Sequence, residues 1–214
     1  MTTLGTDVYA SVSSGGDIYK QTNGTGNFIA LGQTSRNWVG MTTLGTDVYA
    51  CVEGGDIYKQ ANGSGNFIAL GQVSRAWYGM TTLGMDVYAC VNSGDIYKQT
   101  NGTGNFVALG QTSRRWLGMT TLGTDVYASV HSGDIYKQTN GTGNFIALGQ
   151  VSRIWLGMTT LGTDMYVSVY GGDIYRFTGV VTSIGHSLEV TLTRTGAVSV
   201  PYVSITANCQ VIHP

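Results

Sequence analysis

The sequence predicts an all-β protein built from tandem four-stranded units. Apolar residues alternate with polar or small ones over short runs, as at Val8, Ala10 and Val12, and no helical stripe extends beyond one turn. Glycine accounts for 32 of 214 residues and recurs at fixed offsets, where it marks turns. A period of 39 residues (80 − 41) with this content is typical of arrays of four-stranded units. Four near-identical copies and most of a fifth begin at Met1, Met41, Met80, Met119 and Met158.

The second copy shows the expected elements in order. Four runs are predicted to be strands, over residues 38–44, 48–52, 56–60 and 66–70. Turns are expected between them, and Asn62-Gly63 is the strongest hairpin signal. The first run has the pattern Trp-x-Gly-Met-Thr-Thr, whose small Gly and Thr suit an innermost strand near an axis.

A four-stranded sheet of this length cannot bury both of its faces alone. Sheets placed side by side around an axis bury both faces and leave only short, protected edges. We therefore predict an all-β, five-bladed β-propeller of four-stranded antiparallel blades over residues 1–185. The first copy starts at Met1 and has no Ser-Arg-x-Trp start. The fifth departs from the pattern at Phe177, so its outer strand is expected from residues 180–184 or from the tail.

Residues 186–214 match no copy and are predicted to form a C-terminal β-hairpin. Two strand-like runs, 187–194 and 197–206, flank Thr195-Gly196, and Pro201 suits an edge strand. Ring closure, docking onto a partner and oligomerisation remain alternative roles for this tail.

Composition narrows the classes of function. The net charge is −1, 11% of residues are charged, and no basic stripe occurs, which argues against nucleic acid and anionic membranes as partners. No apolar stretch approaches the length of a membrane span, and no secretion signal is recognisable, so membrane insertion is not expected. Cys51 and Cys90 replace Ser at one strand position and are expected to be buried free thiols.

No arrangement of residues indicates catalysis, a metal or a cofactor. His131, His186 and His213 occupy unrelated positions, and no Cys-x-x-Cys pair is present. Asp7, Asp17 and their copies stand beside turns, where we expect them to accept hydrogen bonds from backbone amides. The chain is therefore expected not to be an enzyme.

Each tryptophan follows an arginine by two residues. One interpretation is packing, with the indole between neighbouring blades. The other is a sugar platform, in which the indole faces sugar C–H groups and the guanidinium binds hydroxyl or acidic groups. The residues concerned are Arg36, Trp38, Arg75, Trp77, Arg114, Trp116, Arg153 and Trp155.

Differences among the copies concentrate at three positions. These are the turn after the second strand, the residue before Trp and the residue after it. In a four-stranded blade they meet on one rim, whereas turns at the opposite end are nearly constant. Such a rim indicates either a recognition surface under diversification or drift at exposed sites. The candidate residues it adds are Glu53, Tyr78, Arg115, His131 and Tyr170.

Over residues 1–177 the copies resemble the tectonin and tachylectin kind of lectin propeller. The residues that carry the resemblance are Trp38, Gly40, Asp47-Val48-Tyr49-Ala50 and Gly55-Asp56-Ile57-Tyr58-Lys59, with their copies. Lectins of this kind bind sugars between blades on one face. The resemblance implies sugar pockets near the Arg and Trp pairs, although the unit length and the tail differ from that family.

These observations favour a multivalent carbohydrate-binding module without enzymatic activity. Glycans or glycoconjugates are the expected partners, and the surface of a virion or cell is the suspected location. The alternative is a structural or decoration protein of a virion or another large assembly, docked or oligomerised through residues 186–214.

Overall fold

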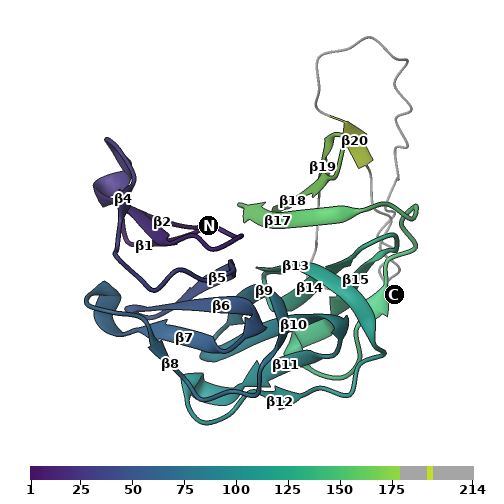
Figure 1. The fold of residues 1–214 in the computed structure, drawn as a ribbon. Helices are drawn as coiled ribbons and strands as arrows, with labels where there is room; N and C mark the ends of the chain where they lie inside the picture. The colour runs from purple at the N-terminus through teal and green to yellow at the C-terminus, as the bar shows by residue number, and fades with distance from the viewer. Residues whose placement is uncertain (179–191, 195–214) are drawn as a thin grey trace, which may run out of the picture.

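The computed structural model describes residues 1–178 and 192–194, and its regular structure consists of strands and four short 3-10 turns (Figure 1). We call the five repeat copies units 1 to 5. Unit 1 contains β1 (Thr2–Leu4), β2 (Asp7–Ser11), β3 (Ile18–Gln21) and β4 (Ile29–Ala30). Unit 2 contains β5 (Trp38–Leu44), β6 (Asp47–Gly55), β7 (Ile57–Gln60) and β8 (Ile68–Ala69). Unit 3 contains β9 (Arg75–Leu83), β10 (Asp86–Gly94), β11 (Ile96–Gln99) and β12 (Val107–Ala108).

Units 4 and 5 continue the same order. Unit 4 contains β13 (Arg114–Leu122), β14 (Asp125–Val130), β15 (Ile135–Gln138) and β16 (Ile146–Ala147). Unit 5 contains β17 (Trp155–Leu161), β18 (Asp164–Val169), β19 (Ile174–Phe177) and β20 (Leu192–Arg194). The 3-10 turns are η1 (Thr22–Gly24), η2 (Ala61–Gly63), η3 (Thr100–Gly102) and η4 (Thr139–Gly141).

Within every unit the four strands pair antiparallel in chain order. In unit 2 the register places Thr42 opposite Tyr49, and Tyr58 opposite Ala69. The ends of β6 and β10 also pair with β9 and β13, so units 2 to 4 form one continuous 12-stranded sheet. Repeated antiparallel four-stranded sheets are therefore confirmed.

The first strands of neighbouring units approach each other closely, as predicted for innermost strands (Figure 1). A Cβ on Gly40 would lie 2.1 Å from the Tyr78 carbonyl oxygen, and one on Gly79 would lie 2.4 Å from that of Leu117. Only glycine permits this backbone approach. The glycine of the Trp-x-Gly motif thus sets the spacing between units.

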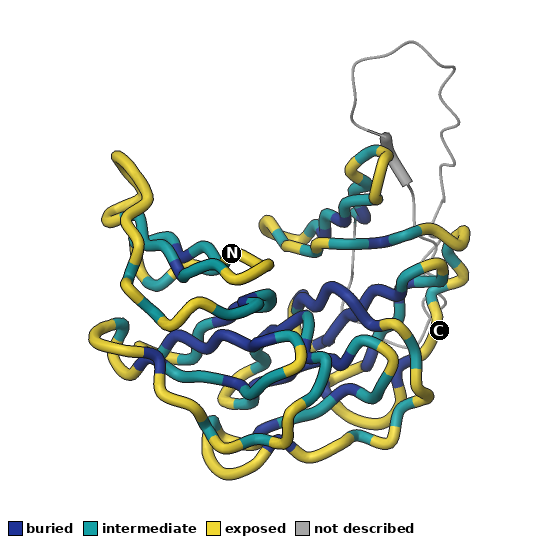
Figure 2. The backbone as a smooth tube through the Cα atoms, in the orientation of Figure 1, coloured by how far each residue is buried: buried dark blue, intermediate teal, exposed yellow. Residues whose placement is uncertain are grey.

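Most of the core lies between units rather than inside them (Figure 2). Tyr9 and Ile18 of unit 1 pack in one cluster with Trp38 and Phe67 of unit 2. Polar bonds join the same surfaces, since the Tyr9 hydroxyl donates to the Gly63 carbonyl at 3.2 Å. A single unit would leave this apolar surface in water, at a cost of about 25 cal/mol per Å².

Strand boundaries follow the prediction in the inner three strands of unit 2 and depart from it in the fourth. β8 covers only Ile68–Ala69, because η2 and the segment after it occupy the predicted hairpin. Asn62 adopts φ 51°, the left-handed conformation that Asn tolerates. In unit 5 the outer strand comes from the tail, as β20 pairs with β19. The strand predicted at 180–184 and the rest of the hairpin lie outside the described residues.

Candidate functional site

On one rim an aspartate accepts a bond from the same Asn N–H in each of units 1 to 4. In unit 2 the Asn62 N–H donates to Asp47 at 2.9 Å, and the Thr46 hydroxyl donates to the Asn62 side chain at 2.9 Å. Lys59 forms an ion pair with Asp47 at 2.9 Å. Changing the aspartate would leave the Asn N–H and the lysine without their shared partner. The constancy of this rim therefore has a structural cause.

Two of these carboxylates have lowered pKa values. The hydrogen bond from Lys20, with that from the Asn23 N–H, holds the pKa of Asp7 below its ordinary value. For Asp47, desolvation raises the pKa, but the Asn62 N–H and Lys59 together outweigh it and leave the pKa lowered. The carboxylates are thus stabilised in their charged form.

The second aspartate of units 1 to 4 also has a structural role. Asp56 accepts bonds from the backbone N–H groups of Ile57, Gly71 and Gln72, at 2.6, 2.9 and 2.8 Å. It thereby ties the third strand to the link that enters the next unit. The prediction that these aspartates accept turn hydrogen bonds is confirmed.

At the opposite rim, residues that vary among the copies contact one another. The Asn37 amide donates to Glu53 at 3.2 Å, and the Arg115 guanidinium lies 3.3 Å from the His131 ring. The Tyr170 N–H donates to the Ile154 carbonyl at 3.0 Å. Two of the three variable positions therefore meet on one rim, which we call the variable rim. It comprises Ser13, Ser14, Asn37, Glu53, Ala76, Asn92, Ser93, Arg115, His131, Ser132, Ile154 and Tyr170.

Neighbouring units share this rim at each junction. Glu53 of unit 2 pairs with Ala76 of unit 3, and Asn92 of unit 3 pairs with Arg115 of unit 4. Asn37 of unit 2 also accepts a bond from the Ser14 N–H of unit 1. Each junction thus combines two turns with the residue before Trp. Asn37 and Asn92 were not among the predicted site residues, but they lie at the same junctions. Both positions vary among the copies, and that variation is the sequence signal that marks them.

The junctions differ in charge. Units 1 and 2 meet around Asn37 and the carboxylate of Glu53, whereas units 3 and 4 meet around Arg115 and His131. At unit 5 the rim carries Tyr170, whose side chain is 71% exposed. The repeats therefore present junctions of one geometry with different chemistry.

The third variable position, the residue after Trp, lies among the first strands of the units instead of on the turns. It lines a cavity of 390 Å³ to which all five units contribute. Ser13 of the unit 1 turn also lines this cavity, so the cavity adjoins the variable rim. Tyr78 is thus separated from the other predicted rim residues. The variable residues that line the cavity are Val39, Tyr78, Leu117 and Leu156.

The predicted arginines stack on tyrosines of their own units. The guanidinium carbons of Arg75 and Arg114 lie 4.8 and 4.7 Å from the ring centres of Tyr97 and Tyr136. Arg36 and Arg153 repeat the arrangement at 5.0 Å. Within residues 1–178 none of these four arginines joins an ion pair. Their N–H donors are therefore held in place by cation–π contact rather than by a carboxylate.

The four tryptophans are core residues, as the packing interpretation predicted. Trp38, Trp77, Trp116 and Trp155 are each 1% exposed. Trp38 meets the Tyr58 ring edge-on at 5.0 Å, and its indole N–H donates to the Thr34 carbonyl at 3.2 Å. With both faces covered, the indoles offer no open platform for a sugar ring. The alternative in which Trp stacks on a ligand does not fit these positions.

Both cysteines of the described chain are buried free thiols, as predicted. Burial raises the pKa of Cys51, and it raises that of Cys90 to about 12. Neither is therefore a thiolate at neutral pH. Cys209 lies outside the described residues.

Other kinds of site were sought in the described part of the chain. It contains no group of three or more His, Cys, Asp and Glu side chains placed to hold a metal ion. Nor does that part contain a helix long and apolar enough to span a membrane.

Known proteins match this chain in fold. Comparisons with protein families and with curated proteins found no match. Among solved structures, the β-propeller domain of Cps50 (Swd1) from Myceliophteria thermophila is similar at 11% identity and TM-score 0.64, over 83% of this chain and 64% of that one. A chain of the nidogen/laminin complex matches at 13% identity and TM-score 0.60, over 81% and 72%.

A third similar structure is that of YCF48 bound to D1 peptide, at 14% identity and TM-score 0.56, over 77% of this chain and 59% of that one. This chain spans less than two thirds of YCF48 and of the Cps50 domain. At such low identity the likeness carries information about fold alone. The chain is an all-β protein with the repeated four-stranded sheets of β-propellers.

Proposed function

We propose that this protein is a multivalent, lectin-like module that binds glycans along the variable rim. The observation that carries the proposal is the contact between variable residues on this rim. Two contacts lie within a unit, in the Asn37–Glu53 and Arg115–His131 pairs, and another crosses a junction, where Asn92 pairs with Arg115. Residues that vary only by drift have no reason to vary where they touch each other. A diversified binding surface does give that pattern.

The groups at the junctions suit sugar hydroxyls. Asn37, Glu53 and His131 supply hydrogen-bond donors and acceptors at the rim. Tyr170 supplies an exposed aromatic face, which the buried tryptophans do not. Arg115 adds a cation, so the junction of units 3 and 4 favours acidic sugars over neutral ones.

Avidity gives weak junctions a useful affinity. A shallow sugar site binds with a Kd of about 1 mM, or about 4 kcal/mol. Several sites that engage one glycan-bearing surface raise apparent affinity by roughly 10² to 10⁴. We further propose that the five units form a five-bladed ring, which directs the junctions to one side. Repeated units and β-propeller neighbours support that ring.

A second candidate function is the binding of a peptide or protein on the same rim. The likeness to a chain of the nidogen/laminin complex, and to YCF48 bound to D1 peptide, favours it. If the bound partner is a virion or another large assembly, this second candidate function is a structural role in that particle.

A glycan array probed with the full chain tests the leading proposal. We expect binding of acidic glycans that is lost in the double variant Arg115→Ala/His131→Ala, with Tm unchanged within about 2 °C because exposed changes cost little. Ser64→Ala, an exposed change on the constant rim, is the matched control and keeps binding. Absence of binding to every glycan at high protein concentration would overturn the proposal. So would equal loss in the rim variant and the control.

A further inference from the structure

The constant rim, opposite the variable rim, carries an Asn-Gly pair in each of units 1 to 4. In units 1, 2 and 4 a threonine hydroxyl of the neighbouring turn donates to the asparagine side-chain oxygen, at 2.8, 2.9 and 2.8 Å. In unit 3 Met85 replaces that threonine and has no hydroxyl to donate. The side chain of Asn101 therefore lacks this bond. The four pairs are Asn23-Gly24, Asn62-Gly63, Asn101-Gly102 and Asn140-Gly141.

The turn of unit 4 matches that of unit 3 closely in its other contacts. Both pairs stand in the sequence Gln-Thr-Asn-Gly-Thr-Gly-Asn-Phe. An aspartate of the same unit accepts the asparagine backbone N–H at 3.0 Å in unit 3 and at 2.9 Å in unit 4. A tyrosine hydroxyl of the preceding unit donates to the glycine carbonyl at 3.3 Å in both. Asn101 and Asn140 therefore form a matched pair, in which Met85 takes the place of Thr124.

An Asn-Gly pair is able to rearrange without an enzyme. The glycine backbone nitrogen attacks Cγ of the asparagine, so that an N–Cγ bond forms and closes a five-membered imide. The Cγ–Nδ2 bond breaks, and the side-chain nitrogen leaves as ammonia with the proton that the glycine N–H gives up. Water then opens the imide at either carbonyl and leaves an aspartyl or an isoaspartyl residue. Glycine favours the attack because it has no Cβ beside its nitrogen.

The folded turn keeps the reacting groups apart. Asn101 has φ 53° and ψ 28°. At this ψ its Cβ and the Gly102 nitrogen lie on opposite sides of the Cα–C bond, whereas the imide ring needs them on the same side. The turn must therefore open locally before the ring closes. Each hydrogen bond that holds the turn closed slows the reaction, and unit 3 has one such bond fewer than unit 4.

We propose that Asn101 is a site of spontaneous deamidation and isoaspartyl formation, because no threonine hydroxyl ties its side chain to the neighbouring turn. Asn101 is exposed, so water reaches the imide. The net contribution of one hydrogen bond corresponds to roughly a two- to tenfold change in an equilibrium. In the folded protein Asn101 is therefore expected to react about two to ten times faster than Asn140.

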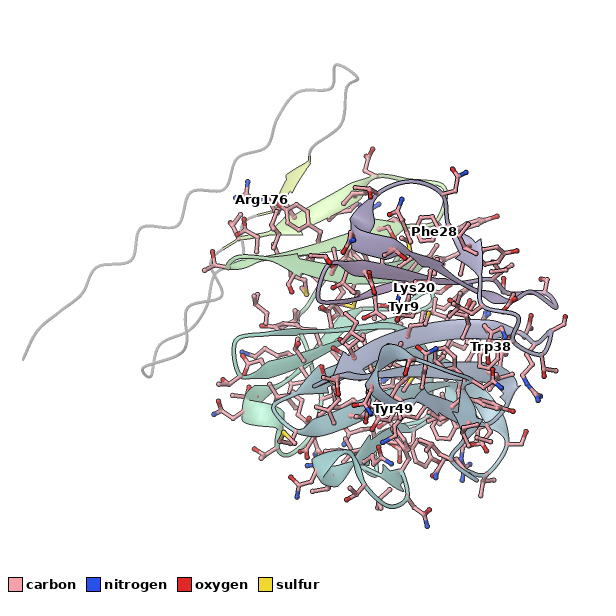
Figure 3. All side chains as sticks on the ribbon, turned by 90° about the vertical axis from the view of Figure 1, so that its left-hand side faces the viewer. Tyr9, Lys20, Phe28, Trp38, Tyr49 and Arg176 are labelled. Carbon is pink, nitrogen blue, oxygen red and sulfur yellow. The ribbon has the colours of Figure 1, made fainter. Side chains whose placement is uncertain are left out.

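The product alters a contact between units 2 and 3. The hydroxyl of Tyr49, which is labelled in Figure 3, donates to the Gly102 carbonyl at 3.3 Å. An isoaspartyl residue at position 101 places an additional methylene in the main chain directly before that glycine. The new carboxylate also stands close to Asp86, which accepts the Asn101 N–H at 3.0 Å. The junction of units 2 and 3 is therefore expected to loosen as the protein ages.

Peptide mapping of the folded protein during incubation at mildly alkaline pH tests the proposal. Cleavage after lysine and arginine releases the four pairs in four peptides of different composition, 21–36, 60–75, 99–114 and 138–153. We expect the conversion of amide to acid to be faster in 99–114 than in 138–153. Fragmentation locates the modified residue and separates aspartyl from isoaspartyl products. A rate at Asn101 equal to or below that at Asn140 would overturn the proposal.

Two substitutions exchange the contact and leave the reacting pairs as they are. Met85→Thr is expected to slow Asn101 to the rate of Asn140, and Thr124→Met is expected to speed Asn140 to the rate of Asn101. Both changes are at exposed positions, so Tm should stay the same. An unchanged rate at Asn101 in Met85→Thr would show that the missing hydroxyl is not the cause.

The denatured protein supplies the last control. In urea Asn101 and Asn140 have the same neighbours in sequence and no turn to open, so their rates should be equal. A difference that persists in urea would contradict the proposal, because the fold could not then be its source. So would a folded protein in which Asn101 stays intact for as long as the denatured chain takes to react.

Discussion

Units 2 to 4 and the two end units have nearly one sequence but differ in burial. Leu122 of unit 4 is 8% exposed, and its equivalent in unit 5, Leu161, is 72% exposed. The residue is the same and its own strand is the same, so the difference comes from the neighbouring unit. Stability in such an array is a property of interfaces, as expected for repeat proteins. The middle units are stable because they have two neighbours.

Replacement of one repeated isoleucine tests this comparison most strongly. Ile96→Ala is expected to lower the free energy of unfolding by about 2–5 kcal/mol, because it opens a cavity in a closed junction. Ile174→Ala, at an isoleucine that is 53% exposed, is expected to cost less than about 1 kcal/mol. Urea denaturation of both variants and the parent protein measures the difference. Equal costs would show that burial at the end unit matches that of the middle.

A smaller effect is expected from the tyrosine hydroxyls that join neighbouring units. The Tyr88 hydroxyl donates to the Gly141 carbonyl at 3.3 Å, so Tyr88→Phe is expected to cost about 1 kcal/mol. The Tyr127 hydroxyl is buried without a partner among the described residues. Tyr127→Phe is therefore expected to leave stability unchanged or to increase it slightly. A loss at Tyr127 as large as that at Tyr88 would indicate that residues outside the described part supply a partner.

The smallest effect is expected from contacts made inside one unit, which should not depend on whether a neighbouring unit is present. Asp7 and Asp47 both have lowered pKa values and pair with lysines of their own units. Their contribution is present above pH of about 4, the unfolded pKa, and is lost as pH falls through the lower folded pKa.

The variants Asp7→Asn and Asp47→Asn keep the oxygen that accepts the backbone bond and remove the ion pair. Each is expected to lower Tm by a few degrees at most at pH 7, and the difference from the parent protein should shrink as pH falls below about 4. Thermal scans from pH 3 to 7 measure it. Because no neighbour is involved, the end unit and the middle unit should respond alike, and a clear inequality would contradict that reasoning.

Much of the fold could be predicted from the sequence because every copy carries the same pattern of strand and turn residues. The inner strand, its Gly and the turn aspartates followed from period and residue type. The short outer strand did not, since η2 and the loop after it pack by contacts that no local pattern reveals. Likewise, the outer strand of unit 5 depended on pairing between residues distant in sequence, β19 and β20.

The candidate site was predicted in part. Variation among copies located the rim, and contacts such as Arg115–His131 confirm that its residues meet. Whether an indole is a binding platform or a core residue depends on what covers its faces, and sequence does not contain that information. The buried Trp38 and the exposed Tyr170 therefore could not be ranked in advance.

The bond from the Tyr49 hydroxyl to the Gly102 carbonyl recurs from unit to unit with equivalent residues, as between Tyr9 and Gly63. A middle unit therefore meets the same partner surface whichever copy stands beside it. Unequal recombination between such copies would insert or delete a whole unit without creating a foreign interface. New junction chemistries can then arise by shuffling existing copies.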